Sequence, residues 1–387
     1  MPELSIVMPC LNEALTLPIC IEKALTFLKE SGVDGEIIIA DNGSTDGSIE
    51  IAARLGARVV NVPIKGYGAA LSAGIHAANG KFVIMGDADD SYNFLGLQPF
   101  VDKLREGYDL VMGNRFQGGI SPGAMPFMHR FVGNPMLSAI GRRIYDHKVC
   151  GDFYCGLRGF RKEAIEKLRI QSTGMEFALE MIIKAELFRL NITEVPTTLS
   201  PDGRDRKPHL RTYRDGWRSL RLYLLMSPRW TFGIPGLALF LIGALAFAIS
   251  FFGVLASSYD AAIAICASAA IVLGYQAVML AVFAKFIAIE VGLHPSLTKF
   301  WRLREPGTLE RFLIAGGLIT VASLFLTAFV ARNFSEHNSS PHLIHFALLA
   351  AVSLIAGGQT IIAGFCLGLF QLVSERREFP RKRASDH

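Results

Sequence analysis

The sequence predicts an α/β domain built on a mixed, mostly parallel sheet, followed by a C-terminal region of four membrane-spanning helices. Over residues 1–230, short apolar runs alternate with helical patterns and with turns rich in Gly, Asp and Asn, which is typical of βαβ units. After Trp230 the composition changes to long apolar stretches. The chain is 51% hydrophobic with a mean hydropathy of +0.36, which is too high for an ordinary soluble enzyme. Its 387 residues allow two domains.

Strands and helices alternate over the first 85 residues. We expect strands at 4–8, 36–40, 58–62 and 81–85, and helices at 13–30, from the capping residues 44–47 to 55, and at 67–78. Right-handed crossovers place Pro9, Asp41 and Asp87, which lie at the ends of strands, on one edge of the sheet. Ligands of open α/β sheets bind at that edge.

An acidic loop follows the fourth expected strand. Asp87 and Asp89 lie two residues apart, so one bend of the chain aims both carboxylates at one cation. Mg²⁺ and Mn²⁺ prefer oxygen ligands and usually share their shell with substrate phosphates. An Asp-rich turn without a metal is the ordinary alternative for such a loop taken alone. The other motifs of this chain favour the metal.

Four long apolar stretches follow, at 231–256, 261–289, 312–330 and 343–373. A helix needs about 20 residues to cross a hydrocarbon core of roughly 30 Å. Four such stretches in succession, with almost no internal charge, argue against buried helices of a soluble core. The α/β domain is expected to span residues 1–203, and residues 204–230 are expected to form a basic amphipathic segment beside the membrane.

Lysine and arginine are distributed unevenly around these spans. They are dense at 204–229, at 299–311 and in the tail at 374–387, and sparse at 257–260 and 332–342. The positive-inside rule therefore predicts an integral protein of the cytoplasmic (inner) membrane, with the α/β domain and both termini in the cytoplasm. We expect no signal peptide and no nucleic-acid partner, because membrane topology explains the net charge of +5. The six cysteines lack C-x-x-C spacing and are expected to be reduced packing residues.

Six short segments together resemble a known enzyme family. They are VMPCLNE at 7–13, ADNGSTDG at 40–47, KGYGAA at 65–70, GDAD at 86–89, GNRF at 113–116 and DFYCGLR at 152–158. As a set in this order, the chain resembles family 2 of the nucleotide-sugar glycosyltransferases over residues 3–200. The branch that it resembles contains the dolichol-phosphate mannose synthases and the polyprenyl-phosphate glucosyltransferases.

The resemblance implies a fold and an activity. The fold is a glycosyltransferase A-type (Rossmann-like) mixed sheet domain followed by the four-helix transmembrane region. The activity is inverting transfer of a hexose from a UDP- or GDP-linked sugar to a polyprenyl (undecaprenyl or dolichyl) phosphate at the cytoplasmic membrane face. The implied cofactor is Mg²⁺ or Mn²⁺, and the partners are the nucleotide sugar, the lipid phosphate and the membrane. Assembly into a homo-oligomer is left open.

Roles for individual residues also follow from the resemblance. The residues implied to bind the nucleotide sugar are Pro9, Asn12, Glu13, Asp41, Lys65, Gly66, Asp87, Arg204, Arg206 and Lys207. Asp87 and Asp89 would hold the metal that bridges the donor diphosphate. The expected catalytic residues are Asp89, Asp90 and Arg115, with Arg115 approaching a phosphate.

The chain departs from the family pattern at two places. Dolichol-phosphate mannose synthases commonly follow the acidic pair with Leu-Gln, whereas this chain has Asp90 and Ser91. Asp90, Ser91 or water is therefore left to complete the metal shell. The later Ser-Lys segment of the family has no clean match, and residues 202–209 take its position.

A lipid acceptor requires a site at the membrane surface. Two stretches, 126–146 and 213–230, combine aromatic and aliphatic side chains with arginines, as interfacial helices do. Arg130, Arg142, Arg143 and Arg218 are the candidates for binding the lipid phosphate. A purely anchoring role is the alternative for both stretches.

Two other functions compete with this interpretation. A processive polysaccharide synthase on the same fold usually carries Gln-x-x-Arg-Trp, but Met226 occupies the Gln position here. A non-catalytic membrane scaffold or transporter with a sugar-nucleotide domain is disfavoured by the intact acidic and basic motif residues and by the lack of an ionisable cluster inside the spans. A dinucleotide-binding interpretation of Gly66 to Gly68 fails, because the third glycine would fall at Leu71.

Overall fold

The computed structural model describes residues 1–145, 150–204, 212–253, 259–295, 307–335 and 342–385. The chain forms two compact units, Met1–Tyr223 and Leu224–His387. Each unit is described separately below.

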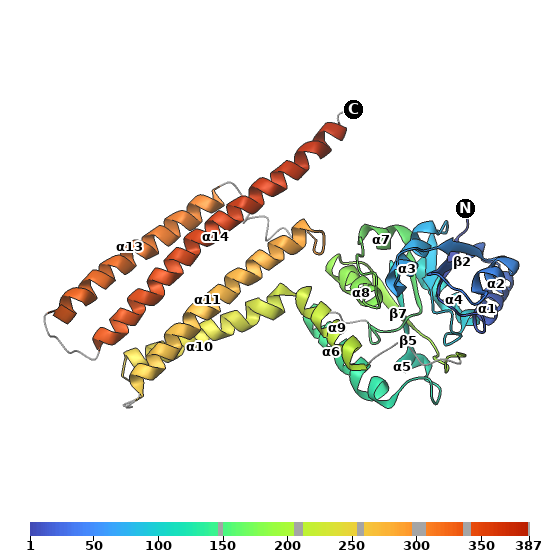
Figure 1. The fold of residues 1–387 in the computed structure, drawn as a ribbon, viewed down its shortest axis with the longest axis horizontal. Coiled ribbons are helices and arrows are strands. Elements are labelled where there is room, and N and C mark those ends of the chain that lie inside the picture. Colours follow the sequence, from blue (N-terminus) through green and yellow to red (C-terminus); the bar gives the residue numbers. More distant parts are fainter. Residues whose placement is uncertain (146–149, 205–211, 254–258, 296–306, 336–341, 386–387) are drawn as a thin grey trace. The chain divides into compact units, whose positions relative to one another are not determined.

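The first unit is built around a seven-stranded sheet with the strand order β3-β2-β1-β4-β6-β5-β7 (Figure 1). The strands are β1 (Leu4–Cys10), β2 (Gly35–Asp41), β3 (Arg58–Asn61), β4 (Phe82–Met85), β5 (Leu110–Asn114), β6 (Arg158–Arg161) and β7 (Ile192–Pro196). β1 lies between β2 and β4 and is parallel to both. β6 is antiparallel to β4 and β5. The predicted mixed, mostly parallel sheet is confirmed.

Helices cover both faces of this sheet, so its central strands are apolar on both sides. The helices are α1 (Leu17–Ser31), α2 (Ser48–Arg54), α3 (Tyr67–Ala77), η1 (Phe94–Gly96), α4 (Gln98–Arg105), α5 (Arg115–Gly118), η2 (His129–Gly133), α6 (Asn134–Tyr145), α7 (Lys162–Lys167), α8 (Phe177–Leu187) and α9 (Thr212–Leu225). Ile6 and Met8 of β1 belong to the main buried core with α1 and α4. On the opposite face, Ala40 of β2 packs with Ala69 and Ala70 of α3.

The first helix begins later than the sequence pattern predicts. The pattern favours 13–30, whereas α1 starts at Leu17 with a proline in its first turn. Asn12 has a left-handed φ of 58°, which ends the strand and turns the chain before the helix. The N–H of Glu13 and that of Ala14 then donate to Ser48 Oγ and Asp46 Oδ2. Residues 11–16 therefore form part of a loop cluster at the end of the sheet.

An exposed apolar ridge lies on η2, α6 and the residues just before them. It consists of Phe127, Met128, Phe131, Val132 and Met136, all of which are exposed. The rings of Phe127 and Phe131 lie 4.8 Å apart. Tyr145 of α6 donates to the carbonyl of Tyr223 at 3.1 Å, which ties α6 to α9. The two predicted amphipathic stretches are thus helical over most of their described residues.

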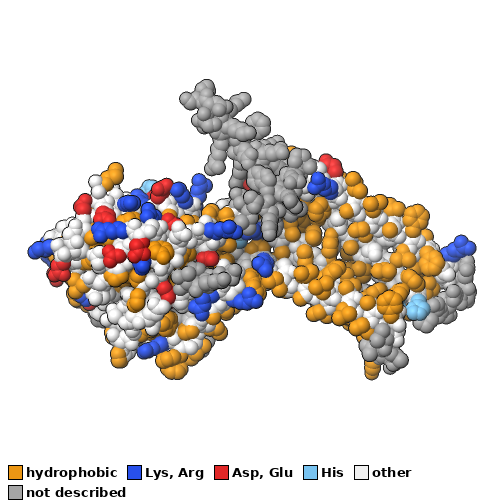
Figure 2. All heavy atoms as spheres, turned by 180° about the vertical axis from the view of Figure 1, so that it is seen from behind, with side chains coloured by type: hydrophobic (Ala, Val, Ile, Leu, Met, Phe, Trp, Pro, Cys, Tyr) orange, Lys and Arg blue, Asp and Glu red, His pale blue; other side chains and the backbone are white. Residues whose placement is uncertain are grey.

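The second unit consists of η3 (Arg229–Gly233) and the long helices α10 (Ile234–Phe251), α11 (Asp260–Glu290), α13 (Thr308–Ser335) and α14 (His342–Ser385). Among the described residues, the helices long and apolar enough to span a membrane are Arg229–Phe251, Asp260–Glu290, Thr308–Phe334 and His342–Phe370. The prediction of four long apolar helices is therefore confirmed, and residues 254–256 of the first predicted stretch lie outside the described residues. α10 packs along α11, and α13 packs along α14. Hydrophobic side chains cover most of the face of this unit that Figure 2 shows.

Glycines let these helices approach closely. A Cβ added at Gly236 of α10 would lie 3.0 Å from the carbonyl of Gly274 in α11, and one at Gly316 of α13 would lie 2.8 Å from the carbonyl of Gly357 in α14. Small residues allow such packing without a hydrophobic driving force between helices in lipid. A hydrogen bond of 2.6 Å between Tyr275 and Thr360 joins α11 to α14.

Candidate active site

The candidate site lies where β1, β2 and β4 end. The parallel register of these three strands brings Cys10 beside Asp41 and Val7 beside Met85. The loops that follow the strands carry Asn12, Glu13 and the 86–90 acidic loop. The predicted gathering of strand ends therefore holds, and it follows from the right-handed crossovers of a parallel sheet.

Asp41 and Asn12 organise one loop from two sides. The buried carboxylate of Asp41 accepts the N–H groups of Gly43 at 2.8 Å and Ser44 at 3.1 Å. Asn12 accepts the N–H of Thr45 through its side-chain oxygen at 2.8 Å. Both side chains lie at the end of the sheet, as the resemblance implies, and both shape the 42–48 loop in this structure.

Asn42 organises a loop of the candidate site and was not among the predicted site residues. Its amide nitrogen donates to the carbonyls of Val62 and Ile64, and its side-chain oxygen accepts the N–H of Gly66 at 2.7 Å. Lys65 donates from Nζ to the Asn42 carbonyl at 2.6 Å. Asn42 thus fastens the loop that carries Lys65 and Gly66 beside Asp41. Its place within the ADNGSTDG motif was the available signal.

Asp87 is held by a tyrosine. Tyr67, the first residue of α3, donates its hydroxyl to Asp87 Oδ1 at 2.9 Å. The second oxygen lies against Gly156, where an added Cβ would approach it to 2.8 Å. Burial, followed by the charge of Asp89, raises the pKa of Asp87 from 3.8 to about 6. A cation at this carboxylate would relieve both effects.

Asp89 has a different set of partners on each oxygen. Oδ1 accepts the N–H of Ser91 at 3.1 Å and its hydroxyl at 2.6 Å. Oδ2 lies 3.3 Å from Arg204 Nη2. The same guanidinium lies 2.9 Å from Glu13 Oε1 and donates from Nε to Glu13 Oε2 at 3.1 Å. The structure therefore brings three residues of the predicted nucleotide-sugar and metal sets into one ion-pair cluster.

Asp90 turns to a different partner. Its φ of 63° is left-handed, and its carboxylate forms an ion pair with Lys23 of α1 at 2.6 Å. Lys23 was not among the expected site residues. In this structure Asp90 fixes the acidic loop to α1, and its predicted catalytic role stays a prediction.

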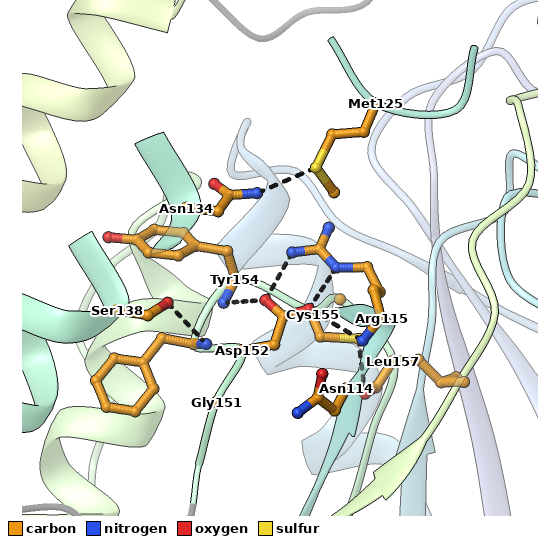
Figure 3. A network of polar contacts seen from close by, with 12 residues as sticks. Asn114, Arg115, Met125, Asn134, Ser138, Gly151, Asp152, Tyr154, Cys155 and Leu157 are labelled. Carbon is orange, nitrogen blue, oxygen red and sulfur yellow. Dashed lines mark hydrogen bonds and ion pairs between the residues drawn. The ribbon is translucent and has the colours of Figure 1, made fainter. Parts of the chain in front are cut away.

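Arg115 belongs to a buried network (Figure 3). Its Nε and Nη2 donate to the two carboxylate oxygens of Asp152 at 2.6 and 2.8 Å. Asp152 also accepts the backbone N–H of Arg115 and that of Tyr154. The arginine side chain is 8% exposed and that of Asp152 is fully buried. The bidentate pair joins the start of α5 to the 152–158 motif. This pairing could not be predicted from the spacing of the two residues in the chain.

Arg158, the last residue of the 152–158 motif, is a second buried arginine of this region. It is fully buried, and its guanidinium donates to the carbonyls of Cys155, Phe153 and Ala178. Burial lowers the pKa of Arg158. Backbone carbonyls accept the hydrogen bonds of its guanidinium, so Arg158 stabilises the 153–157 loop from inside. Gly156 of that loop lies against Asp87.

The candidate lipid-phosphate residues do not converge on one point among the described contacts. Arg142 donates to the carbonyls of Cys150 and Gly151 at 3.5 and 3.4 Å. Arg130 stacks over Phe131 with its guanidinium carbon 5.3 Å from the ring centre. Arg218 of α9 forms an ion pair of 3.6 Å with Glu176, and Arg143 is exposed on α6. Arg206 and Lys207 lie outside the described residues.

Asp87 and Asp89 suit a hard divalent cation. Among the described residues, no group of three or more His, Cys, Asp or Glu side chains is placed to enclose a metal. Two carboxylates on one loop match an ion such as Mg²⁺, which usually takes one or two protein carboxylates and fills its shell with water and substrate phosphates. Burial and, after it, the charge of Asp89 raise the pKa of Asp87, and a bound cation would favour the ionised carboxylate against both.

The sheet order and the acidic loop after β4 define a glycosyltransferase of the A type. Residues 5–169 match the model of "Glycosyl transferase family 2", and residues 282–371 match "Glycosyltransferase family 2 C-terminal transmembrane region". The chain is 34% identical over 372 residues to the low-salt glycan biosynthesis hexosyltransferase Agl6 of Haloferax volcanii, covering 95% of this chain and 89% of the relative. This chain belongs to glycosyltransferase family 2.

Two further similarities are weaker. The dolichyl-phosphate hexose transferase of Haloferax volcanii is 33% identical over 162 residues, which cover 42% of this chain and 68% of that protein. The structure of glucosyl-3-phosphoglycerate synthase from Mycobacterium tuberculosis, in complex with Mn²⁺, UDP-glucose and phosphoglyceric acid, matches with a TM-score of 0.46 and 25% identity, covering 58% of this chain and 79% of that chain. A TM-score this low adds nothing about function. The family predicted from the motifs is confirmed by the matches above.

Proposed function

We propose that this hexosyltransferase moves a hexose, with inversion, from a UDP- or GDP-linked sugar to a polyprenyl phosphate at the cytoplasmic membrane face. The observation that carries the proposal is the acidic strand-end site in a chain whose described residues also include four helices long and apolar enough to span a membrane. The dolichyl-phosphate hexose transferase of Haloferax volcanii supports a lipid-phosphate acceptor. The product would be a lipid-phosphate-linked sugar that serves as a donor for surface glycans or lipids.

The donor side of the proposal uses the strand-end loops. Asp41, Asn12 and Pro9 would line the nucleoside, and Lys65 and Gly66 stand beside them because Asn42 holds their loop. Arg204, followed by Arg206 and Lys207 in the sequence, would serve the diphosphate, as cations do for a leaving group that gains charge.

Asp87 and Asp89 would hold Mg²⁺ or Mn²⁺. Bound there, the ion would stabilise the negative charge that develops on the diphosphate leaving group. The hydroxyl of Tyr67 keeps Asp87 oriented, and Ser91 keeps Asp89 oriented. Arg115 is paired with Asp152 at the start of α5, so the two side chains together carry no net charge, and the predicted approach of Arg115 to a phosphate stays a prediction.

The acceptor side needs little proton chemistry. A phosphate monoester is already anionic at neutral pH, so its attack on the anomeric carbon requires no strong general base. The acceptor must reach the site from a bilayer, and the exposed apolar ridge on η2 and α6 is suited to lie in the interface. Arg130, Arg142, Arg143 and Arg218 lie on or beside the two amphipathic segments and would attract the lipid phosphate.

An assay with defined substrates tests the proposal. The purified full-length protein in detergent receives Mg²⁺ or Mn²⁺, undecaprenyl phosphate and a panel of UDP- and GDP-sugars, and the lipids are analysed by mass spectrometry. We expect one lipid-phosphate hexose from one donor, and none after chelation of the metal with EDTA. A growing polysaccharide would instead support the processive alternative. Release of UDP or GDP from a donor with no lipid-linked hexose formed would refute the polyprenyl phosphate acceptor.

A further inference from the structure

Arg204 contacts the same Asp89 carboxylate that the proposed function assigns to a divalent metal ion. One guanidinium contacts the carboxylates of Glu13 and Asp89, at 2.9 and 3.3 Å from the same Nη2. Asp89 is a proposed metal ligand, and its other oxygen is already engaged by Ser91. The oxygen that remains for a metal is therefore the one that Arg204 holds.

The position of Arg204 is set by the backbone around it. The N–H of Gly203 donates to the carbonyl of Asp89, and the N–H of Ser200 donates to the carbonyl of Ser91, both at 2.9 Å. The 200–204 segment thus lies along the acidic loop. The residue before Arg204 is hydrogen-bonded to the backbone of Asp89, which fixes where the Arg204 side chain begins. A long side chain on a fixed backbone can change partners without unfolding the loop.

The balance of charge explains why such a cation is present. Glu13, Asp87 and Asp89 place three carboxylates in the loops at the strand ends, and Glu13 and Asp89 both contact the one guanidinium of Arg204. Without a cation, partly buried carboxylates at this spacing repel one another. Arg204 neutralises part of this charge in the free protein, and its side chain is only 19% exposed.

We propose that Arg204 is an exchangeable counter-ion of the acidic site. In the free protein it holds Glu13 and Asp89. When the donor arrives, its diphosphate offers Arg204 a new anionic partner, and the Asp89 carboxylate is released for the metal. Metal and nucleotide then bind as a pair, because neither alone displaces Arg204 efficiently. This inference rests on the metal-dependent nucleotide donor of the proposed function and is independent of the lipid acceptor.

Binding of Mn²⁺ tests the exchange without any turnover. The free Mn²⁺ signal in electron paramagnetic resonance is titrated with full-length protein in detergent, without nucleotide and with UDP or GDP. For the wild type we expect weak Mn²⁺ binding alone and much tighter binding with one nucleotide. For R204Q we expect Mn²⁺ alone to bind about 10-fold tighter than to the wild type, because no guanidinium has to leave Asp89. The increase in Mn²⁺ affinity that UDP or GDP causes should fall by a similar factor, and Mn²⁺ should increase nucleotide affinity by that same smaller factor, because coupling between two ligands is reciprocal.

Two variants serve as controls. R204K keeps the charge but cannot bridge two carboxylates with a planar fork, so its affinity for Mn²⁺ alone should lie between those of the wild type and R204Q. R105Q removes the same charge from an arginine that pairs with Glu3 at 2.8 Å, and its Mn²⁺ binding should equal that of the wild type.

The outcomes separate this inference from the proposed function. Equal or weaker binding of Mn²⁺ alone to R204Q, with the wild type still showing nucleotide-dependent binding, overturns the exchange and leaves the donor chemistry intact. Loss of UDP or GDP affinity in R204Q with unchanged binding of Mn²⁺ alone makes Arg204 a phosphate ligand only. Absence of Mn²⁺ binding to every form, with or without nucleotide, overturns both the exchange and the metal-dependent donor site.

Discussion

At the scale of single residues, the acidic loop shows how neighbouring aspartates acquire different surroundings. Asp87 accepts a hydrogen bond from the hydroxyl of Tyr67. Asp89 accepts from Ser91 through one oxygen and contacts Arg204 through the other. Asp90 has a left-handed φ and forms an ion pair with Lys23. The sequence places the three carboxylates together, but it does not say which way each side chain points. That choice depends on partners that lie from two to more than a hundred residues away.

Asp89 gives the first prediction at this scale. Asp89→Asn removes the negative charge that a divalent metal requires, while it preserves an oxygen that accepts from Ser91. We expect the rate of lipid-hexose formation to fall at least about 100-fold with little change in the thermal unfolding midpoint. Asp102→Asn, at a carboxylate on α4 that accepts from Gln98, is the matched control and should retain wild-type turnover. Substantial activity in the Asp89 variant would rule out its role as a metal ligand.

Asp87 gives a prediction about stability and pH. Its folded-state pKa of about 6 lies above the ordinary 3.8, so ionisation of Asp87 destabilises the folded protein. This penalty is complete above about pH 6 and disappears below the ordinary value, where both states are protonated. Asp87→Asn, which still accepts from Tyr67, should therefore raise the unfolding midpoint of the metal-free protein at pH 7.5.

The size of that shift should depend on pH. Each kcal/mol regained corresponds to about 2–4 °C in a domain of this size, and the difference between variant and wild type should shrink towards zero as the pH falls to 4. The measurement is differential scanning fluorimetry in detergent with EDTA present. A stabilisation that is the same at both pH values would show that burial of the charge is not its cause.

At the scale of elements, the loop at 170–174 is held in place by α8. Glu180 accepts the N–H groups of Gln171 and Ser172, and Lys184 forms an ion pair with Glu180 at 2.7 Å. The carbonyl of Thr173 then accepts the N–H of Ala69 in the first turn of α3. This contact fixes the start of α3, which carries the tyrosine that orients Asp87.

The exposed apolar ridge gives a prediction for η2 and α6. Phe131→Asp places a charge on a ridge that we propose lies in the lipid interface. In vesicles that contain polyprenyl phosphate, we expect the KM for the lipid to rise several-fold while the KM for the nucleotide sugar stays unchanged. Leu95→Asp, at another exposed apolar residue of the first unit, is the matched control. Equal behaviour of the two variants would show that the ridge has no special place in acceptor use.

At the scale of the whole molecule, the two units correspond to the two regions that the sequence predicts, an α/β domain and a region of long apolar helices. The first contains the sheet and the acidic loop, and the described residues of the second contain the four helices that are long and apolar enough to span a membrane. The boundary between the units falls after Tyr223, in the last turn of α9, whereas the sequence analysis separated residues 204–230 from both domains.

Topology gives the whole-molecule prediction. The positive-inside rule places both termini in the cytoplasm, and four spans return the chain to the side on which it began. A green fluorescent protein fused after residue 387 should therefore fluoresce in a bacterial host, and alkaline phosphatase fused after Tyr259, between α10 and α11, should be active in the periplasm. The reverse pattern would contradict the proposed cytoplasmic site.

The sequence by itself determined the α/β class, the four spans and the gathering of strand ends. These features follow from periodicity, from apolar length and from the handedness of crossovers, all of which are local or nearly local properties. Motifs in family order also identified the family, and they predicted a set of site residues, of which Asn12, Asp41 and Asp87 lie at or just after the strand ends.

Tertiary structure alone decided which charges meet. The pairing of Arg115 with Asp152, of Arg204 with Glu13 and Asp89, and of Lys23 with Asp90 joins residues that are 37 or more positions apart. Any arginine can pair with any carboxylate, and the energy of an ion pair depends on burial and geometry rather than on spacing in the chain. Those pairings became definite only when the sheet order and the loops around it fixed where each side chain begins.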